Sequence, residues 1–213
     1  MKSPVFRLFH RKSDHSLIPV NLVLPSQSHS IEAAFVTSKE DNLKADALVT
    51  NSPNTSIGVK TADCMPIFLY DENSQIIAVA HAGWKGLING IIENTIRTMI
   101  ENGATIPNIK VVIGPSIGPC CYPIFGNRKN EFEKHFPHHV DRIFVERKEK
   151  AYLNLQECAK IISLEQGIEK VNIDLTHFEC TSCNPEKFDS YFRDGICGRQ
   201  LLSVISLSDK QNT

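Results

Sequence analysis

The sequence predicts an α+β fold, a single-domain layered α/β sandwich with mixed sheets. Short β-branched runs follow one another from residue 45 to residue 83 with no helical pattern between them. Helical periodicity appears only later and in separate blocks, so strands and helices do not alternate as a doubly wound parallel sheet requires. The 213 residues contain no internal repeat, low-complexity tract or linker, and we therefore expect one domain.

The first predicted strands are four neighbouring apolar runs. They are ADALVTN (45–51), SIGVK (56–60), MPIFLYD (65–71) and QIIAVAHAG (75–83), and Asn, Pro, Ser and Asp separate them as turn residues. The segment DENSQ at 71–75 predicts a hairpin loop between the last two strands. This hairpin brings the start of one strand and the end of the next to the same edge.

Two helices are predicted. After Gly86 the apolar residues recur at every third or fourth position, and Gly103 closes this run as a C-terminal cap. A second amphipathic helix is predicted over Leu155–Glu165. Among the remaining segments, IKVVIGPSIG (109–118) predicts a buried strand that runs into a loop, and VNIDL (171–175) predicts a short strand.

The last segment, SYFRDGICGRQLLSVISL (190–207), predicts a hairpin whose second strand is apolar. We therefore expect this segment to close the fold as a pair of antiparallel strands.

Charge and hydropathy exclude several classes of partner. The 23 Lys and Arg residues nearly balance the 24 Asp and Glu residues, and the net charge of -1 gives no basis for binding nucleic acid or an anionic membrane. No apolar stretch approaches the ~20 residues that a membrane-spanning helix needs. The N-terminus lacks the apolar core of a secretory signal, so we expect a cytoplasmic protein. We also expect it to be a monomer or a homodimer.

The seven cysteines are an odd number in a sizeable domain, whereas small disulfide-bonded scaffolds carry a dense, even set of cysteines.

Two motifs contain the densest group of residues that can carry out chemistry: Thr-Ala-Asp-Cys at 61–64 and His-Ala-Gly-Trp-Lys-Gly at 81–86. The predicted hairpin places Cys64 and His81 at one end, where they could share an ion or act as nucleophile and base. The alternative is a buried Cys64 and a loop histidine with no chemical role.

Three longer motifs, TADCMPI, AVAHAGWKG and GPSIGPCCY, occur in an order and spacing that closely resemble the laccase-domain proteins, also called the multicopper polyphenol oxidase family. That family includes purine nucleoside phosphorylases and bacterial peptidoglycan editing factors. FRDGICGR (192–199) is similar to its closing elements. The resemblance implies the laccase-domain fold, with an N-terminal segment at 1–24 that is shortened relative to the family, a laccase-like catalytic domain at 25–208 and a tail at 209–213.

The resemblance implies one zinc ion bound by His29, Cys64 and His81. Two imidazoles and one thiolate leave a coordination position open, as in catalytic rather than structural zinc sites. Copper could occupy the same donors as an adventitious ion. The eight histidines contain no His-x-His pair, so the residues do not supply a multicopper cluster.

The activity that the resemblance implies is phosphorolysis of adenosine, inosine and methylthioadenosine, together with deamination of adenosine. Asp63, Cys64 and His81 are the candidate catalytic residues, with Asp63 as proton carrier or, alternatively, as a carboxylate that only caps a turn. Three cations and one aromatic residue are candidates for binding phosphate and the nucleoside: Lys85, Arg193, Arg199 and Tyr122. Each cation has the alternative of a solvated surface charge.

Two further cysteine motifs need separate interpretation. Cys180 and Cys183 form a Cys-x-x-Cys with His177 upstream, which indicates either a local embellishment, a redox pair or a weak second zinc site. Cys120 and Cys121 are adjacent, and in an extended chain their side chains face opposite ways. We therefore do not expect these two residues to share a metal ion.

Two other functions compete with the zinc-dependent enzyme. In one, Cys64 is the nucleophile and His81 the base of a hydrolase that edits peptidoglycan precursors. In the other, the protein is a zinc-stabilised binding module without turnover. A copper-loaded polyphenol oxidase is a further alternative for the same donor set.

Overall fold

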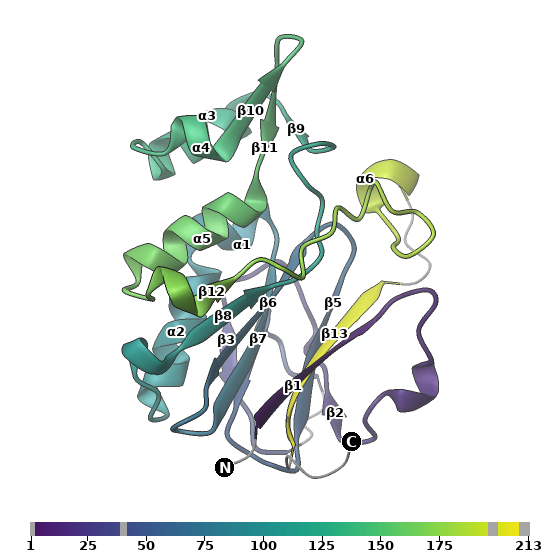
Figure 1. The fold of residues 1–213 in the computed structure, drawn as a ribbon, viewed down its shortest axis with the longest axis vertical. Coiled ribbons are helices and arrows are strands. Elements are labelled where there is room, and N and C mark those ends of the chain that lie inside the picture. The colour runs from purple at the N-terminus through teal and green to yellow at the C-terminus, as the bar shows by residue number, and fades with distance from the viewer. Residues whose placement is uncertain (1–2, 39–41, 196–199, 209–213) are drawn as a thin grey trace.

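A computed structural model describes residues 3–38, 42–195 and 200–208 (Figure 1). Its largest sheet has six strands, and both parallel and antiparallel pairs occur in it. The order is β12 (Ile173–Asp174), β8 (Lys110–Ile113), β6 (Met65–Asp71), β7 (Ile76–Ala82), β4 (Ala47–Thr50) and β3 (Ala33–Phe35). The predicted α+β class with mixed sheets is confirmed.

A four-stranded sheet packs against one face of the large sheet. Its order is β1 (Ser3–Phe9), β13 (Leu201–Ser208), β5 (Ser56–Thr61) and β2 (Leu22–Val23). Ile57 and Ile205 from this sheet share a buried apolar cluster with Phe68 and Val79 of the large sheet. The first 24 residues therefore contribute two strands, β1 and β2, to this sheet.

Helices cover the opposite face of the large sheet, as Figure 1 shows for α2 and α5. Side chains alternate between faces along a strand, so Ile67 and Leu69 point to the helices while Phe68 points to the smaller sheet. The result is three layers, and the predicted layered sandwich is confirmed. No helix in the described part of the chain is long and apolar enough to cross a membrane.

The helical region after residue 83 differs from the single predicted helix. It consists of α1 (Trp84–Asn89) and α2 (Ile91–Glu101), separated by Gly90. Gly90 has φ 101° and ψ 34°, a left-handed conformation that glycine adopts without a steric penalty and that ends a right-handed helix. The second predicted helix is confirmed as α5 (Leu155–Glu165), and the side chain of Asn154 caps it by accepting a hydrogen bond from Glu157 N.

The predicted hairpin over 190–207 is wrong. Its first half contains a short helix, α6 (Tyr191–Asp194), which begins at the Ser190 cap and ends at Gly195 in the left-handed region. Its second half is β13, which pairs with β1 and β5 rather than with the preceding residues. The apolar pattern located the strand correctly, but pattern alone does not identify the partner strand.

A third sheet lies at one end of the molecule, at the top of Figure 1. It contains β10 (Phe144–Arg147), β11 (Lys150–Leu153) and β9 (Pro123–Ile124). Two helices, α3 (Asn127–His135) and α4 (Val140–Ile143), lie beside it. In the described ranges, three short 3-10 helices lie in the connections: η1 (His15–Leu17), η2 (Ile106–Asn108) and η3 (Lys170–Asn172).

The predicted β6–β7 hairpin positions the site. The two strands pair antiparallel, with Met65 opposite Ala82 and Pro66 opposite His81. Cys64 immediately precedes β6, so its side chain and that of His81 lie at the same end of the hairpin. The proximity expected from the sequence is confirmed.

Candidate metal centre and cavity

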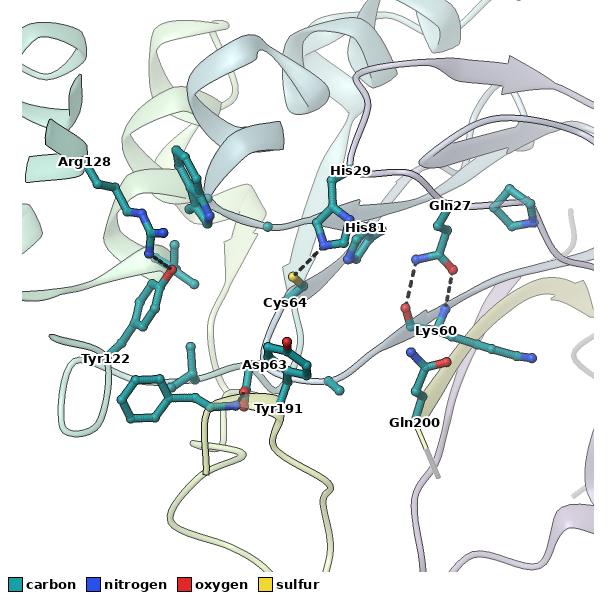
Figure 2. Close-up of a pocket in the computed structure, with 17 residues that line it drawn as sticks. Gln27, His29, Lys60, Asp63, Cys64, His81, Tyr122, Arg128, Tyr191 and Gln200 are labelled. Atoms are coloured by element: carbon teal, nitrogen blue, oxygen red, sulfur yellow. Dashed lines mark hydrogen bonds between the residues drawn. The ribbon is translucent and has the colours of Figure 1, made fainter. Parts of the chain in front are cut away.

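Three donor side chains meet at the end of the β6–β7 hairpin. The ligand atoms of His29, Cys64 and His81 all lie within 4.8 Å of one another (Figure 2). His29 Nε2 lies 3.8 Å from Cys64 Sγ, and the two imidazole rings meet edge to face with centroids 4.7 Å apart. The three residues come from distant parts of the chain, and together they could hold a metal ion.

Asp46 orients this group. Its buried carboxylate lies 2.8 Å from Nδ1 of His81, which leaves Nε2 of that ring as the available ligand atom. The same carboxylate accepts hydrogen bonds from the backbone N–H groups of Ser28, His29 and Ser30 at 3.1, 3.0 and 2.7 Å. A carboxylate behind a ligating histidine fixes the orientation of the ring, which is typical of metal sites.

Asp46 is not among the site residues that the sequence motifs predict. The sequence feature that could have pointed to Asp46 is a charged residue near the start of the apolar run ADALVTN. Burial acts to raise the pKa of Asp46, but the hydrogen bonds from His81, Ser30 and Ser28 outweigh burial and hold that pKa well below its usual range. Asp46 is therefore a permanent anion beside the two histidines.

The charge states of the other donors follow from these contacts. Burial raises the pKa of the Cys64 thiol, but hydrogen bonds with His29 and His81 outweigh it and lower the pKa to about 7. Burial lowers the pKa of His81, but hydrogen bonds with Asp46 and Cys64 raise it to about 9. In the metal-free protein near neutral pH, Cys64 is thus partly a thiolate, the form that binds metals and attacks electrophiles.

Gly83 lets the donors approach the start of α1. A Cβ atom at this position would lie 2.9 Å from Cys64 Sγ and 3.4 Å from Cδ2 of His29. Carbon and sulfur atoms do not come this close without displacement. The first glycine of the motif His-Ala-Gly-Trp-Lys-Gly is therefore required by the packing of two donor residues against the backbone.

The donors line a cavity of about 910 Å³. Figure 2 shows the donors between the Arg128–Tyr122 pair on one side and the Gln27–Lys60 pair on the other. The lining consists of Pro25, Gln27, His29, Lys60, Ala62, Asp63, Cys64, His81, Gly83, Trp84, Ile117, Tyr122, Arg128, Leu155, Tyr191, Phe192 and Gln200. Its volume lies within the range of roughly 300–1,000 Å³ that small-molecule sites occupy.

Arg128 is a cavity residue that the sequence analysis missed. It belongs to α3, and its guanidinium carbon lies 4.3 Å from the centroid of the Trp84 ring. Its Nη1 donates a hydrogen bond of 3.3 Å to the hydroxyl of Tyr122. The surrounding sequence, Asn-Arg-Lys-Asn, resembles an ordinary surface helix, so only the tertiary structure identifies this cation.

The predicted substrate-binding residues fall in different places. Tyr122 lines the cavity. Lys85 is exposed and does not line the cavity, and its Nζ lies 5.6 Å from the centroid of the Trp84 ring. The Arg193 guanidinium donates to the carbonyl oxygens of Thr181, Ser182 and Phe188 and pairs with Asp194, so it holds a loop together. Arg199 lies outside the described residues.

Asp63 lines the cavity, but neighbouring groups occupy its oxygens. Oδ1 accepts a hydrogen bond of 2.6 Å from the Thr181 hydroxyl. Oδ2 accepts one from the Ser190 hydroxyl at 3.0 Å and one from Phe192 N at 2.7 Å. Its φ of 78° is in the left-handed region, at the turn that presents Cys64. These contacts hold the 181–192 segment against the wall of the cavity.

The expectation that Cys120 and Cys121 face apart is wrong. Residues 119–121 form a turn in which Cys121 N donates to Gly118 O at 2.9 Å, so the chain is not extended there. The Sγ atoms of Cys120 and Cys121 both approach Cys183 Sγ, at 3.5 and 3.3 Å. With Cys180 they form a second group of donor atoms, all within 4.8 Å of one another.

These features define a mixed-sheet α+β domain with three donor side chains that could hold a metal ion beside a cavity. The chain belongs to the family described as multi-copper polyphenol oxidoreductase laccase, which matches residues 7–208. It is 35% identical over 181 residues to a purine nucleoside phosphorylase of Clostridium acetobutylicum, with 84% of this chain and 74% of that protein covered. It is 33% identical over 189 residues to the adenosine deaminase RL5 of an unknown prokaryotic organism, with 83% and 71% covered.

Solved structures share the fold. The Bacillus licheniformis hypothetical protein YfiH superposes with a TM-score of 0.80 at 31% identity, with 88% of this chain and 74% of that chain covered. YlmD from Geobacillus stearothermophilus gives a TM-score of 0.81 at 25% identity, with 89% and 74% covered. The family and fold that the sequence motifs implied are therefore confirmed.

Proposed function

We propose that the protein is a zinc-dependent purine nucleoside phosphorylase that also deaminates adenosine. Its substrates are adenosine, inosine or methylthioadenosine together with phosphate. The observation that carries the proposal is the convergence of His29, Cys64 and His81 on the wall of a cavity of about 910 Å³. Relatives named purine nucleoside phosphorylase and adenosine deaminase, at 33–35% identity, support the same assignment.

The donor set fits zinc. Imidazole nitrogen and thiolate sulfur are the ligands that zinc prefers, and three protein ligands leave a fourth position for a reactant. Within the described residues, the donor group at this site consists of His29, Cys64 and His81, with Asp46 behind His81. A bound zinc ion would supply Lewis-acid chemistry to a reactant in the open position.

Phosphorolysis exchanges one bond at the sugar. A phosphate oxygen bonds to C1′, the C1′–N9 bond breaks, and the base leaves with the electron pair and takes up a proton. Arg128 and Lys60 are the lining cations that can bind phosphate, and the planar fork of Arg128 suits two phosphate oxygens. Deamination instead consumes water and converts adenosine to inosine and ammonia.

Aromatic side chains suit the base. Trp84, Tyr122 and Phe192 line the cavity, and their faces can stack on a purine. The Tyr122 oxygen accepts a hydrogen bond from Arg128 Nη1, so its own O–H remains available to donate to a purine nitrogen as the base departs. Asp63 then has a positioning role, since its oxygens accept hydrogen bonds from Thr181, Ser190 and Phe192.

The test is a product assay on zinc-loaded protein with adenosine and phosphate. We expect ribose 1-phosphate and adenine, and inosine from the deamination. His29→Ala, Cys64→Ser and His81→Ala should each lose the zinc ion of this three-donor site and the activity, because a three-ligand site rarely tolerates the loss of one ligand. His138→Ala is the matched control, since His138 is exposed and outside both donor groups. Absence of all three products from the zinc-loaded protein would contradict the proposal.

One observation favours a second candidate, a hydrolase acting on peptidoglycan precursors. Cys64, His81 and Asp46 are linked in series, which is the arrangement of nucleophile, base and orienting carboxylate. The two candidates respond oppositely to a chelator. Metal removal should abolish purine turnover and zinc should restore it, whereas a thiol hydrolase keeps its activity in chelator and loses it on alkylation.

A further inference from the structure

A second group of thiols lies outside the cavity, where two loops meet. Cys120 and Cys121 belong to the loop that follows β8, and Cys180 and Cys183 belong to the segment that follows β12. Backbone pairing joins the two loops at a bridge between Ser116 and Cys180. Ser116 N donates to Glu179 O, and Thr181 N donates to Ser116 O, both at 3.1 Å.

The sulfur positions fit a tetrahedral ion. All four Sγ atoms lie within 4.8 Å of one another, and Cys183 Sγ lies 3.5 Å from that of Cys120 and 3.3 Å from that of Cys121. Four thiolates at about 2.3 Å from a zinc ion are separated by roughly 3.8 Å. A disulfide requires about 2.0 Å between sulfurs, and these four cysteines are free thiols.

The surroundings of the sulfurs also fit thiolates. Gly118 N donates a hydrogen bond of 3.3 Å to Cys180 Sγ, which stabilises a negative sulfur. A Cβ at Gly118 would lie 3.2 Å from Cys120 Sγ and 3.3 Å from Cβ of Cys180. The absence of a side chain at Gly118 therefore leaves room for these two cysteines to lie close to the loop backbone. The Arg193 guanidinium donates to the carbonyl oxygens of residues 181 and 182, so it holds the stretch of chain between Cys180 and Cys183 in place.

We propose that Cys120, Cys121, Cys180 and Cys183 bind one zinc ion in a closed tetrathiolate site. Four protein ligands leave no position for a reactant, so the role of this site is structural. It is separate from the three-donor centre and does not depend on the proposed enzymatic function. The soft thiolate donors select zinc over magnesium or calcium.

The proposed site fixes one wall of the cavity. The loop before Cys120 carries Ile117, and the residue after Cys121 is Tyr122; both line the cavity. On the other side of the junction, Thr181 donates to Asp63 in the turn that presents Cys64. A zinc ion that joins the two loops therefore holds the cavity wall at Ile117 and Tyr122 in position relative to the turn that carries Cys64.

The test counts zinc in protein purified under reducing conditions. We expect two zinc ions per chain in the wild type, one in Cys64→Ser, one in Cys183→Ser, and none in the double variant. Because Cys183 is exposed, its replacement by serine leaves no buried void. Cys158→Ala is the control, since Cys158 is buried in α5 outside both donor groups and should leave both ions bound.

A second measurement needs no variant in the proposed site. In Cys64→Ser protein, Cys120 and Cys183 are exposed, yet zinc should protect both from alkylation until a strong chelator is added. Retention of one zinc ion by this variant, together with that protection, supports the proposal. A zinc-free Cys64→Ser protein, alkylation that is equally fast without chelator, or a disulfide among the four cysteines would overturn it.

Discussion

Asp46 is the residue on which the geometry of the three-donor group His29, Cys64 and His81 depends. Its two oxygens accept hydrogen bonds from three successive backbone N–H groups, at 28–30, and contact Nδ1 of His81. One buried carboxylate thus positions the segment that carries His29 and also orients the ring of His81. Because the carboxylate only accepts hydrogen bonds, a group of the same shape that also donates does not replace it.

The first prediction concerns Asp46→Asn. An amide nitrogen in place of Oδ2 would turn its N–H donors toward the backbone N–H groups of Ser28 and Ser30, so both of these hydrogen bonds would be lost. We expect the metal affinity of the three-donor centre to fall about 10–100-fold, the usual effect of losing a partner behind a ligating histidine. Competition with a chromophoric chelator measures this affinity in Cys183→Ser protein. An unchanged affinity would show that Asp46 does not orient the ligand.

The second prediction is a pH dependence of Cys64 in metal-free protein. Its pKa is lowered from 9.0 to about 7, so the reactive thiolate should increase as pH rises through 7 and be nearly complete at pH 9. Alkylation of the Cys64 peptide, followed by mass spectrometry from pH 5 to 10, should therefore have a midpoint near 7. In His81→Ala the midpoint should move to higher pH, because one of the groups that stabilise the thiolate is absent. Equal midpoints near 9 in both proteins would refute this assignment.

The third prediction concerns Arg128 in the cavity. Arg128→Gln removes a charge that can bind phosphate, and a hydrogen bond to a charged group contributes about 1.5–3 kcal/mol. We expect KM for phosphate to rise roughly tenfold or more, with a smaller effect on KM for the nucleoside. Lys134→Gln is the matched control on the same helix, because Lys134 is exposed and outside the cavity lining. Equal changes in the two KM values would argue against a phosphate site at Arg128.

At the scale of elements, the junction of β7 and α1 determines how closely the backbone approaches the donors. Gly83 caps α1 with an extended backbone, φ -82° and ψ 174°, so it is retained for space and not for a left-handed conformation. Cys64 Sγ and the His29 ring occupy the volume of its missing side chain. The helix therefore begins against the metal centre.

The fourth prediction follows from this contact. In Gly83→Ala the new Cβ would lie 2.9 Å from Cys64 Sγ, so the thiol must move from the position in which it contacts His29. We expect the folded structure to persist and metal binding at the three-donor centre to weaken, as measured by the same chelator competition. Gly126→Ala is the control: nothing lies within 4 Å of its added Cβ, so its backbone strain should not alter metal binding. Equal metal affinities in the two variants would contradict this role of Gly83.

At the scale of the whole molecule, the large sheet separates two apolar clusters, one under the helices and one under the four-stranded sheet. The second cluster joins the two ends of the described chain, because β1 and β13 are paired there. Phe6 packs its ring 5.1 Å from that of Phe68 in the large sheet. The N-terminal strand is thus an integral part of the sandwich.

The fifth prediction tests this second cluster. Ile205 lies in β13 and is fully buried, so Ile205→Ala removes apolar contact and leaves a cavity. We expect the free energy of unfolding to fall by about 2–5 kcal/mol in a denaturant titration. Val20→Ala should change it by less than about 0.5 kcal/mol, because Val20 is fully exposed. A small effect at Ile205 would mean that the smaller sheet contributes little to stability.

Local pattern predicted much of the fold. The strands around residues 47–82 and the helix Leu155–Glu165 follow from period-2 and period-3.6 apolar spacing, which depend only on neighbouring residues. The break at Gly90 and the helix at 191–194 were missed, because glycine conformation and a single capped turn give little periodic signal. The pairing of β13 with β1 and β5 joins segments far apart in sequence, and apolar spacing does not encode a partner.

By itself, the sequence determined the fold class, the β6–β7 hairpin and the proximity of Cys64 and His81, since a short loop and a fixed strand period leave few arrangements. Only the tertiary structure assigned Asp46 and Arg128 to the site and brought the two cysteine pairs together. The contacts of Asp46 with His81, of Arg128 with Trp84 and of Cys120 with Cys183 join residues that are 35 to 63 positions apart, and their geometry depends on how sheets and loops pack. The chemical type of each side chain is read directly from the sequence, whereas which distant side chains meet in space depends on how the whole chain packs.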